Sequence, residues 1–119
     1  MDKSTHLART TDLGRISVST EAIAQVVGHV AAESYGIVGM AGRRFPRLPG
    51  RDRLTDGIEV KPSNGGIEID LHVVVEYGLN LAEVASSVSN RVAYEVERLT
   101  GLPVRAVEVH VDDVRTSGK

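Results

Sequence analysis

Alternating apolar and polar residues in the middle of the chain predict two strands joined by a tight turn. The stretch GIEVKPSNGGIEIDLHVVVEY holds two alternating runs, and a period of two is typical of a half-buried strand. Asn64 and Gly65 lie between the runs, and both tolerate the positive φ that a hairpin turn requires. In the second run the residues on one side are Ile67, Ile69, Leu71, Val73, Val75 and Tyr77, and those on the other are Glu68, Asp70, His72, Val74 and Glu76. We expect one core face and one largely polar face.

Apolar residues at helical spacing predict two amphipathic helices, one over residues 20–34 and one from residue 80 to about residue 100. Ser19 or Thr20 offers an N-cap oxygen for the first helix, and Asn80 does so for the second. Gly36 and Gly101 follow the two helices at positions where a left-handed residue ends a helix.

Three shorter strands complete the predicted order. GRISVS (residues 14–19) alternates, IVGMA (37–41) is apolar enough for a buried strand, and residues 104–112 place valines on one side. The resulting order is β-α-β-β-β-α-β. We expect an α+β two-layer sandwich, in which the two helices pack on one face of a mixed, largely antiparallel sheet.

Length and composition favour one domain of an ordinary globular protein. The chain has 119 residues, of which 41% are hydrophobic and 25% charged. We predict a flexible N-terminal tail (1–13), a single domain (14–114) and a C-terminal tail (115–119). The absence of cysteine excludes disulfides, thiolate metal sites and cysteine nucleophiles. The first residues do not resemble a secretory signal, and no apolar run approaches the roughly 18 residues that span a bilayer, so we expect a cytoplasmic protein.

Positive charge is concentrated in RRFPRLPGRDR, which belongs to a predicted loop over residues 43–56. This segment carries +4, while the net charge of the whole chain is −2, so the remainder sums to −6. Such a segment is suited to an anionic partner, either lipid headgroups or an acidic protein surface, although a solvated connection explains it too. The partner-binding residues predicted here are Arg43, Arg44, Arg47, Arg51 and Arg53.

Negative charge and histidine gather on the predicted polar sheet face. In VEVHVDDV, alternation places Glu108, His110 and Asp112 on that face, while Asp113 turns away or leaves the strand. The acidic docking face predicted from both strands consists of Glu68, Asp70, Glu108 and Asp112.

A metal site is the alternative interpretation of the same polar face. If the two strands are neighbours, His72 and His110 meet, and with nearby carboxylates they form a site for a divalent ion such as zinc or manganese, as in a metal carrier or metal-dependent enzyme. A solvated strand face predicts the same pattern without any ion. His29 and Glu33 stand four residues apart on the first helix, and we interpret them as an exposed structural pair.

The order of motifs resembles the alkaline-shock-protein family of Gram-positive bacteria, also called envelope stress response proteins. The resemblance is carried by GRISVS leading into a helix that ends in GIVGM, by VVVEYG, and by LTGLPVRAVEVHVDDV. It implies a non-enzymatic protein of the cell envelope stress response that self-associates, without a cofactor and without a catalytic motif. It also implies a cytoplasmic location, in some members at the inner face of the membrane through a separate integral-membrane anchor.

Nucleic-acid binding is a weaker alternative. GIVG and GMAG match the glycine loop of KH domains, but that loop must lead into a helix, and Pro46 and Pro49 oppose one here. An acidic sheet face also repels phosphate. We therefore expect no specific nucleic-acid partner, and we hypothesise that the arginine-rich loop of one copy docks on the acidic sheet face of another.

Overall fold

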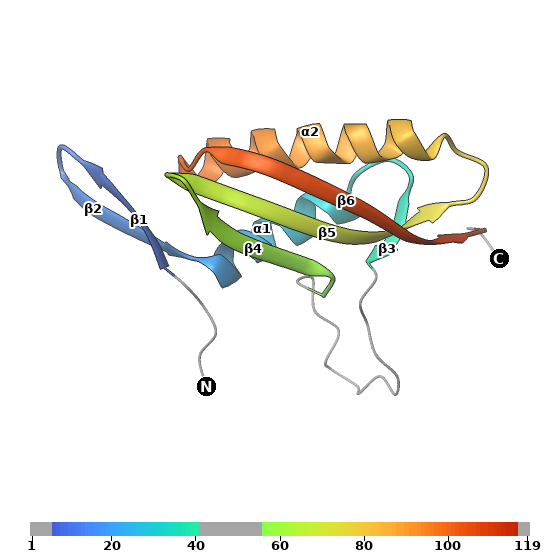
Figure 1. Cartoon of the computed structure of the whole chain (residues 1–119), viewed down its shortest axis with the longest axis horizontal. Helices are drawn as coiled ribbons and strands as arrows, with labels where there is room; N and C mark the ends of the chain where they lie inside the picture. The colour runs from blue at the N-terminus through green and yellow to red at the C-terminus, as the bar shows by residue number, and fades with distance from the viewer. Residues whose placement is uncertain (1–5, 41–55, 117–119) are drawn as a thin grey trace.

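The computed structural model describes residues 6–40 and 56–116, which form two helices and six strands. Figure 1 shows both helices on one side of the main sheet, with the first two strands extending beyond one end of it. In chain order the elements are β1 (His6–Thr11), β2 (Gly14–Ser19), α1 (Thr20–Ala32), β3 (Ile37–Met40), β4 (Ile58–Ser63), β5 (Gly66–Glu76), α2 (Leu81–Thr100) and β6 (Val104–Arg115). The predicted α+β sandwich is confirmed.

Strand β5 is the centre of the main sheet. On one side it pairs antiparallel with β4, from Gly66 to Leu71, and with β3, from Val73 to Val75. On the other side it pairs with β6 in parallel, from Ile67 to Glu76. The predicted mixed and largely antiparallel character is therefore correct. The parallel pair follows from the α2 crossover, since a helix is the usual connection between parallel strands.

The core lies between the helices and one face of β5. Its side chains are aliphatic, as expected for a chain with one Phe and no Trp. Tyr77 was expected on the core side, but β5 ends at Glu76 and Tyr77 is 73% exposed. The main contributors to the core are Ile23, Val27, Val30 and Ala31 of α1, Ile67, Ile69, Leu71, Val73 and Val75 of β5, and Val84, Val88, Val92 and Val96 of α2.

The predicted turn, the N-caps of both helices and the end of α2 are confirmed, whereas α1 ends at Ala32, with Glu33 as its C-cap, before the predicted end at residue 34. Ser19 and Asn80 cap α1 and α2 by accepting hydrogen bonds from the backbone N–H groups of residues Ala22 and Glu83. Gly101 ends α2 in the left-handed conformation with φ 77°. In the hairpin turn Asn64 has φ 35° and Gly65 has φ 78°, as a turn with two positive-φ residues requires.

Within the predicted N-terminal tail, His6–Thr11 forms β1, a strand that the sequence pattern did not predict. This strand pairs antiparallel with β2, from His6 opposite Ser19 to Thr11 opposite Gly14. Its formation depends on backbone pairing rather than on an alternating apolar pattern, since Leu7 and Ala8 are its apolar residues. At the other end β6 reaches Arg115, past the predicted strand end at Asp112 and the predicted domain end at residue 114.

The arginine-rich loop predicted over residues 43–56 lies almost wholly outside the described residues. The next described residue is Asp56, two residues before the start of β4.

Candidate functional site

The sheet face turned away from the helices, here called the outer face, carries the predicted polar residues in rows across the strands. The register pairs Glu59 of β4 with Asp70 of β5, and Asp70 with Glu108 of β6. Three carboxylates therefore follow one another across three strands. Like charges directly opposite each other on a sheet are destabilising, so this row costs stability rather than contributing to it.

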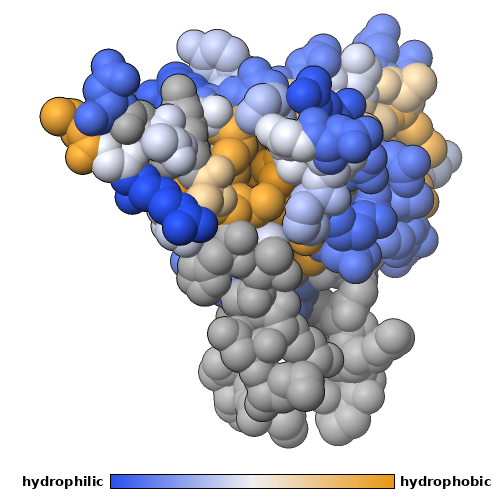
Figure 2. All heavy atoms as spheres, turned by 60° about the vertical axis from the view of Figure 1, so that its left-hand side comes forward, coloured by the Kyte–Doolittle hydropathy of each residue, from blue (hydrophilic) through white to orange (hydrophobic). Residues whose placement is uncertain are grey.

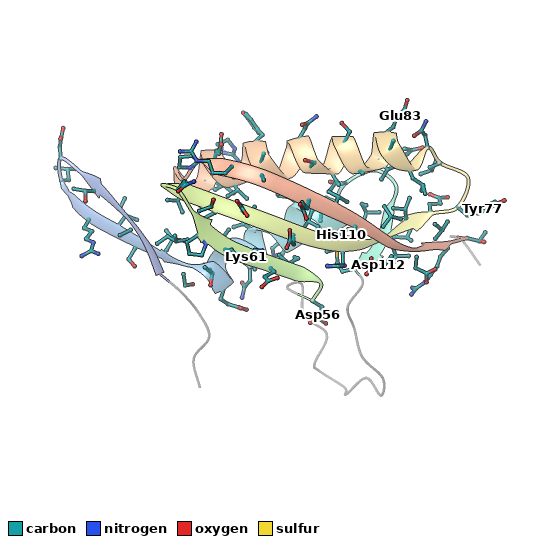
Figure 3. The ribbon with its side chains drawn as sticks, in the orientation of Figure 1. Asp56, Lys61, Tyr77, Glu83, His110 and Asp112 are labelled. Carbon is teal, nitrogen blue, oxygen red and sulfur yellow. The ribbon has the colours of Figure 1, made fainter. Side chains whose placement is uncertain are left out.

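The next row brings the two histidines together. His72 lies opposite His110 in the parallel register, and their rings stack with centroids 4.4 Å apart and an interplanar angle of 12°. The His72 Nδ1 atom lies 3.0 Å from Asp112 Oδ2. The predicted meeting of His72 and His110 is confirmed, because β5 and β6 are neighbours. Figure 3 shows His110 and Asp112 on the face turned to the viewer, with α1 behind the sheet.

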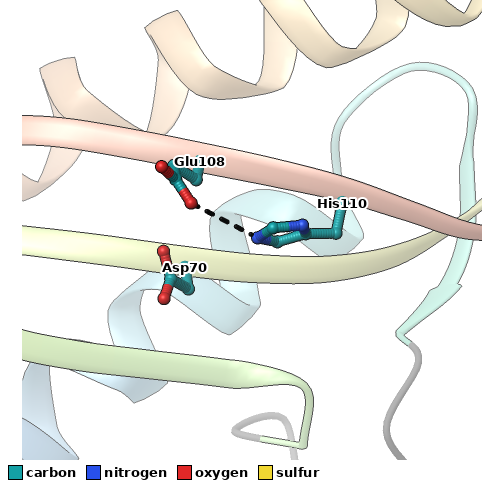
Figure 4. Close-up of side chains that lie close together, drawn as sticks. All are labelled: Asp70, Glu108 and His110. Carbon is teal, nitrogen blue, oxygen red and sulfur yellow. Dashed lines mark ion pairs between the residues drawn. The ribbon is translucent and has the colours of Figure 1, made fainter.

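Asp70, Glu108 and His110 form a compact group on this face. Each offers one ligand atom, and the three atoms lie within 4.8 Å of one another. His110 Nε2 is 3.5 Å from Glu108 Oε1, the contact dashed in Figure 4. Asp70 is the least exposed of the three, with 21% of its side chain accessible, against 42% for His110 and 70% for Glu108. The group combines imidazole nitrogen and carboxylate oxygen, the donor types that divalent ions take in proteins.

Two polar contacts from β4 partly offset the negative charge of the carboxylates on β5. Lys61 Nζ lies 3.5 Å from Asp70 Oδ2, and the lysine side chain is half exposed. The Ser63 hydroxyl donates a hydrogen bond of 2.9 Å to Glu68 Oε2. Three of the predicted acidic docking residues, Glu68, Asp70 and Asp112, therefore have polar contacts within the protein. The fourth, Glu108, lies 3.5 Å from His110, and its side chain is 70% exposed.

Sequence reasoning missed Glu59 and Lys61 as members of the outer face. The signal was present, because Ile58 and Val60 alternate with them and pack against the core cluster. Once β4 is placed next to β5, that alternation leaves Glu59 and Lys61 on the polar side. Their omission followed from leaving the order of strands in the sheet open.

In the predicted pair of His29 and Glu33, the glutamate side chain contacts α2 rather than the histidine in the described part of the chain. Glu33 Oε1 lies 3.5 Å from Arg91 Nη2 of α2, and the Glu33 carbonyl accepts a hydrogen bond from Arg91 Nη1. Its carboxylate therefore joins the two helices. On α2 itself, the Arg98 guanidinium donates to Glu95 Oε1 at 2.7 Å, and this hydrogen bond and charge raise the pKa of Arg98. The Glu33–Arg91 and Glu95–Arg98 contacts both belong to the helical layer.

The predicted partner-binding residues of the loop fall outside the described residues. These are Arg43, Arg44, Arg47, Arg51 and Arg53. Their role in partner binding stays a prediction from the charge of the sequence.

A shallow hollow of about 310 Å³ lies between β1 and the turn that joins β4 to β5. Leu7, Ala8 and Leu102 give it an apolar part, and residues 62–66 form its other wall. Figure 2 shows apolar atoms in a hollow at this end of the molecule. It is distant from the histidines along β5, since the turn precedes Gly66 and His72 follows six residues later.

Comparisons of the sequence with known proteins point to one family. The model of the alkaline shock protein 23 family, described as having a cell envelope-related function, matches residues 8–116. The chain is 35% identical over 112 residues to the uncharacterized protein YloU of Bacillus subtilis (strain 168), covering 90% of this chain and 93% of that protein. It is 28% identical over 107 residues to a stress response regulator gls24 homolog of Streptococcus pyogenes serotype M3 (strain MGAS315), covering 87% of this chain and 60% of that protein.

Among solved structures, the chain is similar in fold to a protein titled MamM CTD H264E. The TM-score is 0.50 at 13% identity, covering 78% of this chain and 93% of the other. At this identity the likeness concerns the arrangement of helices and strands. None of the helices in the described part of the chain combines the length and hydrophobicity needed to cross a bilayer.

Proposed function

The chain belongs to the alkaline-shock-protein family that its sequence resembles, and we propose that it acts there as a non-enzymatic, self-associating protein of the cell envelope stress response. The family description names a cell envelope-related function, and relatives carry the name of a stress response regulator. These descriptions support a role in contacts between proteins rather than in turnover of a substrate.

The observation that carries the proposal is the open, acidic outer face of the sheet. In the described part of the chain both helices cover the opposite face (Figure 1). The row Glu59, Asp70 and Glu108 keeps like charges side by side at a cost to stability. A face that is destabilised by its own charges gains most from a cationic partner, which makes it suited to docking.

A second copy of the chain offers the complementary charge. The segment of residues 43–53 carries five arginines and one aspartate, against −6 for the rest of the chain. A contact between the loop of one copy and the outer face of the next is heterologous, and such contacts propagate into chains or rings. We propose this contact as the basis of self-association.

Sedimentation velocity over a range of protein concentrations tests the assembly. We expect larger species at high concentration and their loss at high salt, because exposed charges are screened. Glu108→Gln should weaken assembly, and Gln25→Lys, an equal change in net charge on the exposed side of α1, should not. Replacing the five loop arginines by glutamine should have the largest effect. A strictly monomeric protein, or an assembly indifferent to salt and to these variants, contradicts the proposal.

We also propose that the protein is cytoplasmic and peripheral at the inner face of the cell membrane, held there by an integral-membrane partner. The family description and the basic segment support this proposal. Cross-linking and affinity purification from the native cell should recover an integral-membrane protein, and purified protein should not sediment with neutral liposomes. Sedimentation with anionic liposomes alone would replace the protein anchor by direct lipid binding through the arginines.

A further inference from the structure

We propose that Asp70, Glu108 and His110 bind a divalent first-row transition ion, with Zn²⁺ as the probe. This site goes beyond the proposed assembly and does not depend on it. The ligands come from two neighbouring strands, Asp70 from β5 and the other two from β6, so the sheet positions them.

The geometry of the group fits a small coordination sphere. Ligand atoms held at 2.0–2.2 Å from a tetrahedral ion lie roughly 3.3–3.6 Å apart. The three ligand atoms already lie within 4.8 Å of one another, and the His110 Nε2 to Glu108 Oε1 distance is 3.5 Å. Small side-chain rotations therefore complete three ligand positions, and the exposure of Glu108 leaves further positions to water.

The electrostatics of the outer face favours a cation at this place. Glu59 and Glu108 flank Asp70 on either side in the register. Lys61 is the cationic side chain that contacts Asp70 among the described residues, at 3.5 Å, with half of its surface exposed. A dication bound between Asp70 and Glu108 removes the repulsion that the lysine offsets in part.

The types of ligand atom determine which class of ion the site binds. One imidazole nitrogen with two carboxylate oxygens suits zinc or manganese better than calcium or magnesium, which take oxygen ligands. The ring of His110 is supported by the stacked ring of His72, which in turn contacts Asp112. This stacking limits the rotation of the His110 ring.

Isothermal titration calorimetry and NMR of the histidine side chains test the site, with ZnCl₂ added to the full, untagged chain. We expect one ion per chain and site-specific changes at the His110 resonances. Asp70→Asn, Glu108→Gln and His110→Gln should each weaken Zn²⁺ binding at least tenfold. His29→Gln is the matched control, since His29 is exposed on α1 away from the sheet, and its affinity should equal that of the parent chain. Thermal unfolding without metal verifies that each variant is folded.

Two further measurements sharpen the result. Lys61→Gln removes the cation that shares Asp70, so Zn²⁺ affinity should rise several-fold. Mg²⁺ at the same concentrations should leave the His110 resonances unchanged. The proposal is overturned if Zn²⁺ produces no saturable change at His110, if His29→Gln weakens binding as much as the three ligand variants do, or if Lys61→Gln lowers the affinity. Sedimentation run in parallel reports on assembly separately, so either proposal can fail alone.

Discussion

The two faces of strand β5 differ in what their side chains contribute. On the core face Ile67, Ile69 and Leu71 are fully buried beneath the helices. On the outer face Asp70 and His72 keep partial exposure and lie next to like residues of β6. One face of β5 thus stabilises the sheet through buried aliphatic side chains, while its other face places like side chains next to each other.

This difference separates the residues that determine the fold from those that determine contacts. Burial of aliphatic side chains stabilises by about 25 cal/mol per Å², and it requires little more than matching shape and hydrophobicity. The outer face places carboxylates in a row and stacks two imidazoles, an arrangement that burial of the core does not require. We infer that the outer face reflects what the protein binds.

The largest effect is expected from the core face. Leu71→Ala should lower the free energy of unfolding by about 2–5 kcal/mol, because it removes buried methyl groups and leaves a cavity. Urea unfolding followed by circular dichroism measures the change. Glu59→Gln, on the adjacent outer side of β4, is the control and should stay within about 0.5 kcal/mol of the parent chain. Equal losses in both variants would contradict the separation of the faces.

An intermediate effect is expected where β6 joins β5. The Pro103 carbonyl accepts a 2.9 Å hydrogen bond from the Ile67 N–H, and a Cβ added at Gly66 would collide with that same oxygen. Gly66→Ala should therefore cost about 1–3 kcal/mol, measured by urea unfolding.

Gly39→Ala serves as its matched control within the same sheet. The nearest atom to an added Cβ there is Val74 Cβ at 3.8 Å, an ordinary contact. Its stability should stay close to that of the parent chain. If the two alanine variants unfold at the same urea concentration, close packing at Pro103 does not constrain the sheet.

The smallest effect, of opposite sign, is expected on the outer face. Glu108→Gln should raise the free energy of unfolding by about 0.2–1 kcal/mol in metal-free buffer, because it relieves repulsion across from Asp70. The gain should shrink when salt is raised to about 0.5 M, since both groups are solvent-accessible. Urea unfolding at the two salt concentrations checks this, and a loss of stability at low salt would show that Glu108 is already compensated.

Much of the fold could be predicted from local patterns in the sequence. The alternation in β5, the Asn64–Gly65 turn and the helix boundaries at Asn80 and Gly101 are encoded by neighbouring residues, and all are confirmed. Strand β1 was missed because its partner β2, rather than its own pattern, makes it a strand.

The composition of the site was predictable, but its arrangement was not. Alternation alone placed Glu108 and His110 on one face. That Asp70 lies opposite Glu108 depends on the length of the α2 crossover and on the register shift near Glu68. The boundaries of α2 were predictable, but no local sequence signal specifies the register shift or which strands are neighbours, so the meeting of His72 and His110 could be stated only as a condition.

The separation of β5 and β6 by α2 along the chain has a consequence for biosynthesis. Strand β6 cannot pair with β5 until α2 and β6 itself have been synthesised, and until then one edge of β5 stays open to other nascent chains. Long-range parallel pairing is also slow to form. Premature termination after α2 would therefore yield a product whose unpaired β5 edge is prone to pair with strands of other chains.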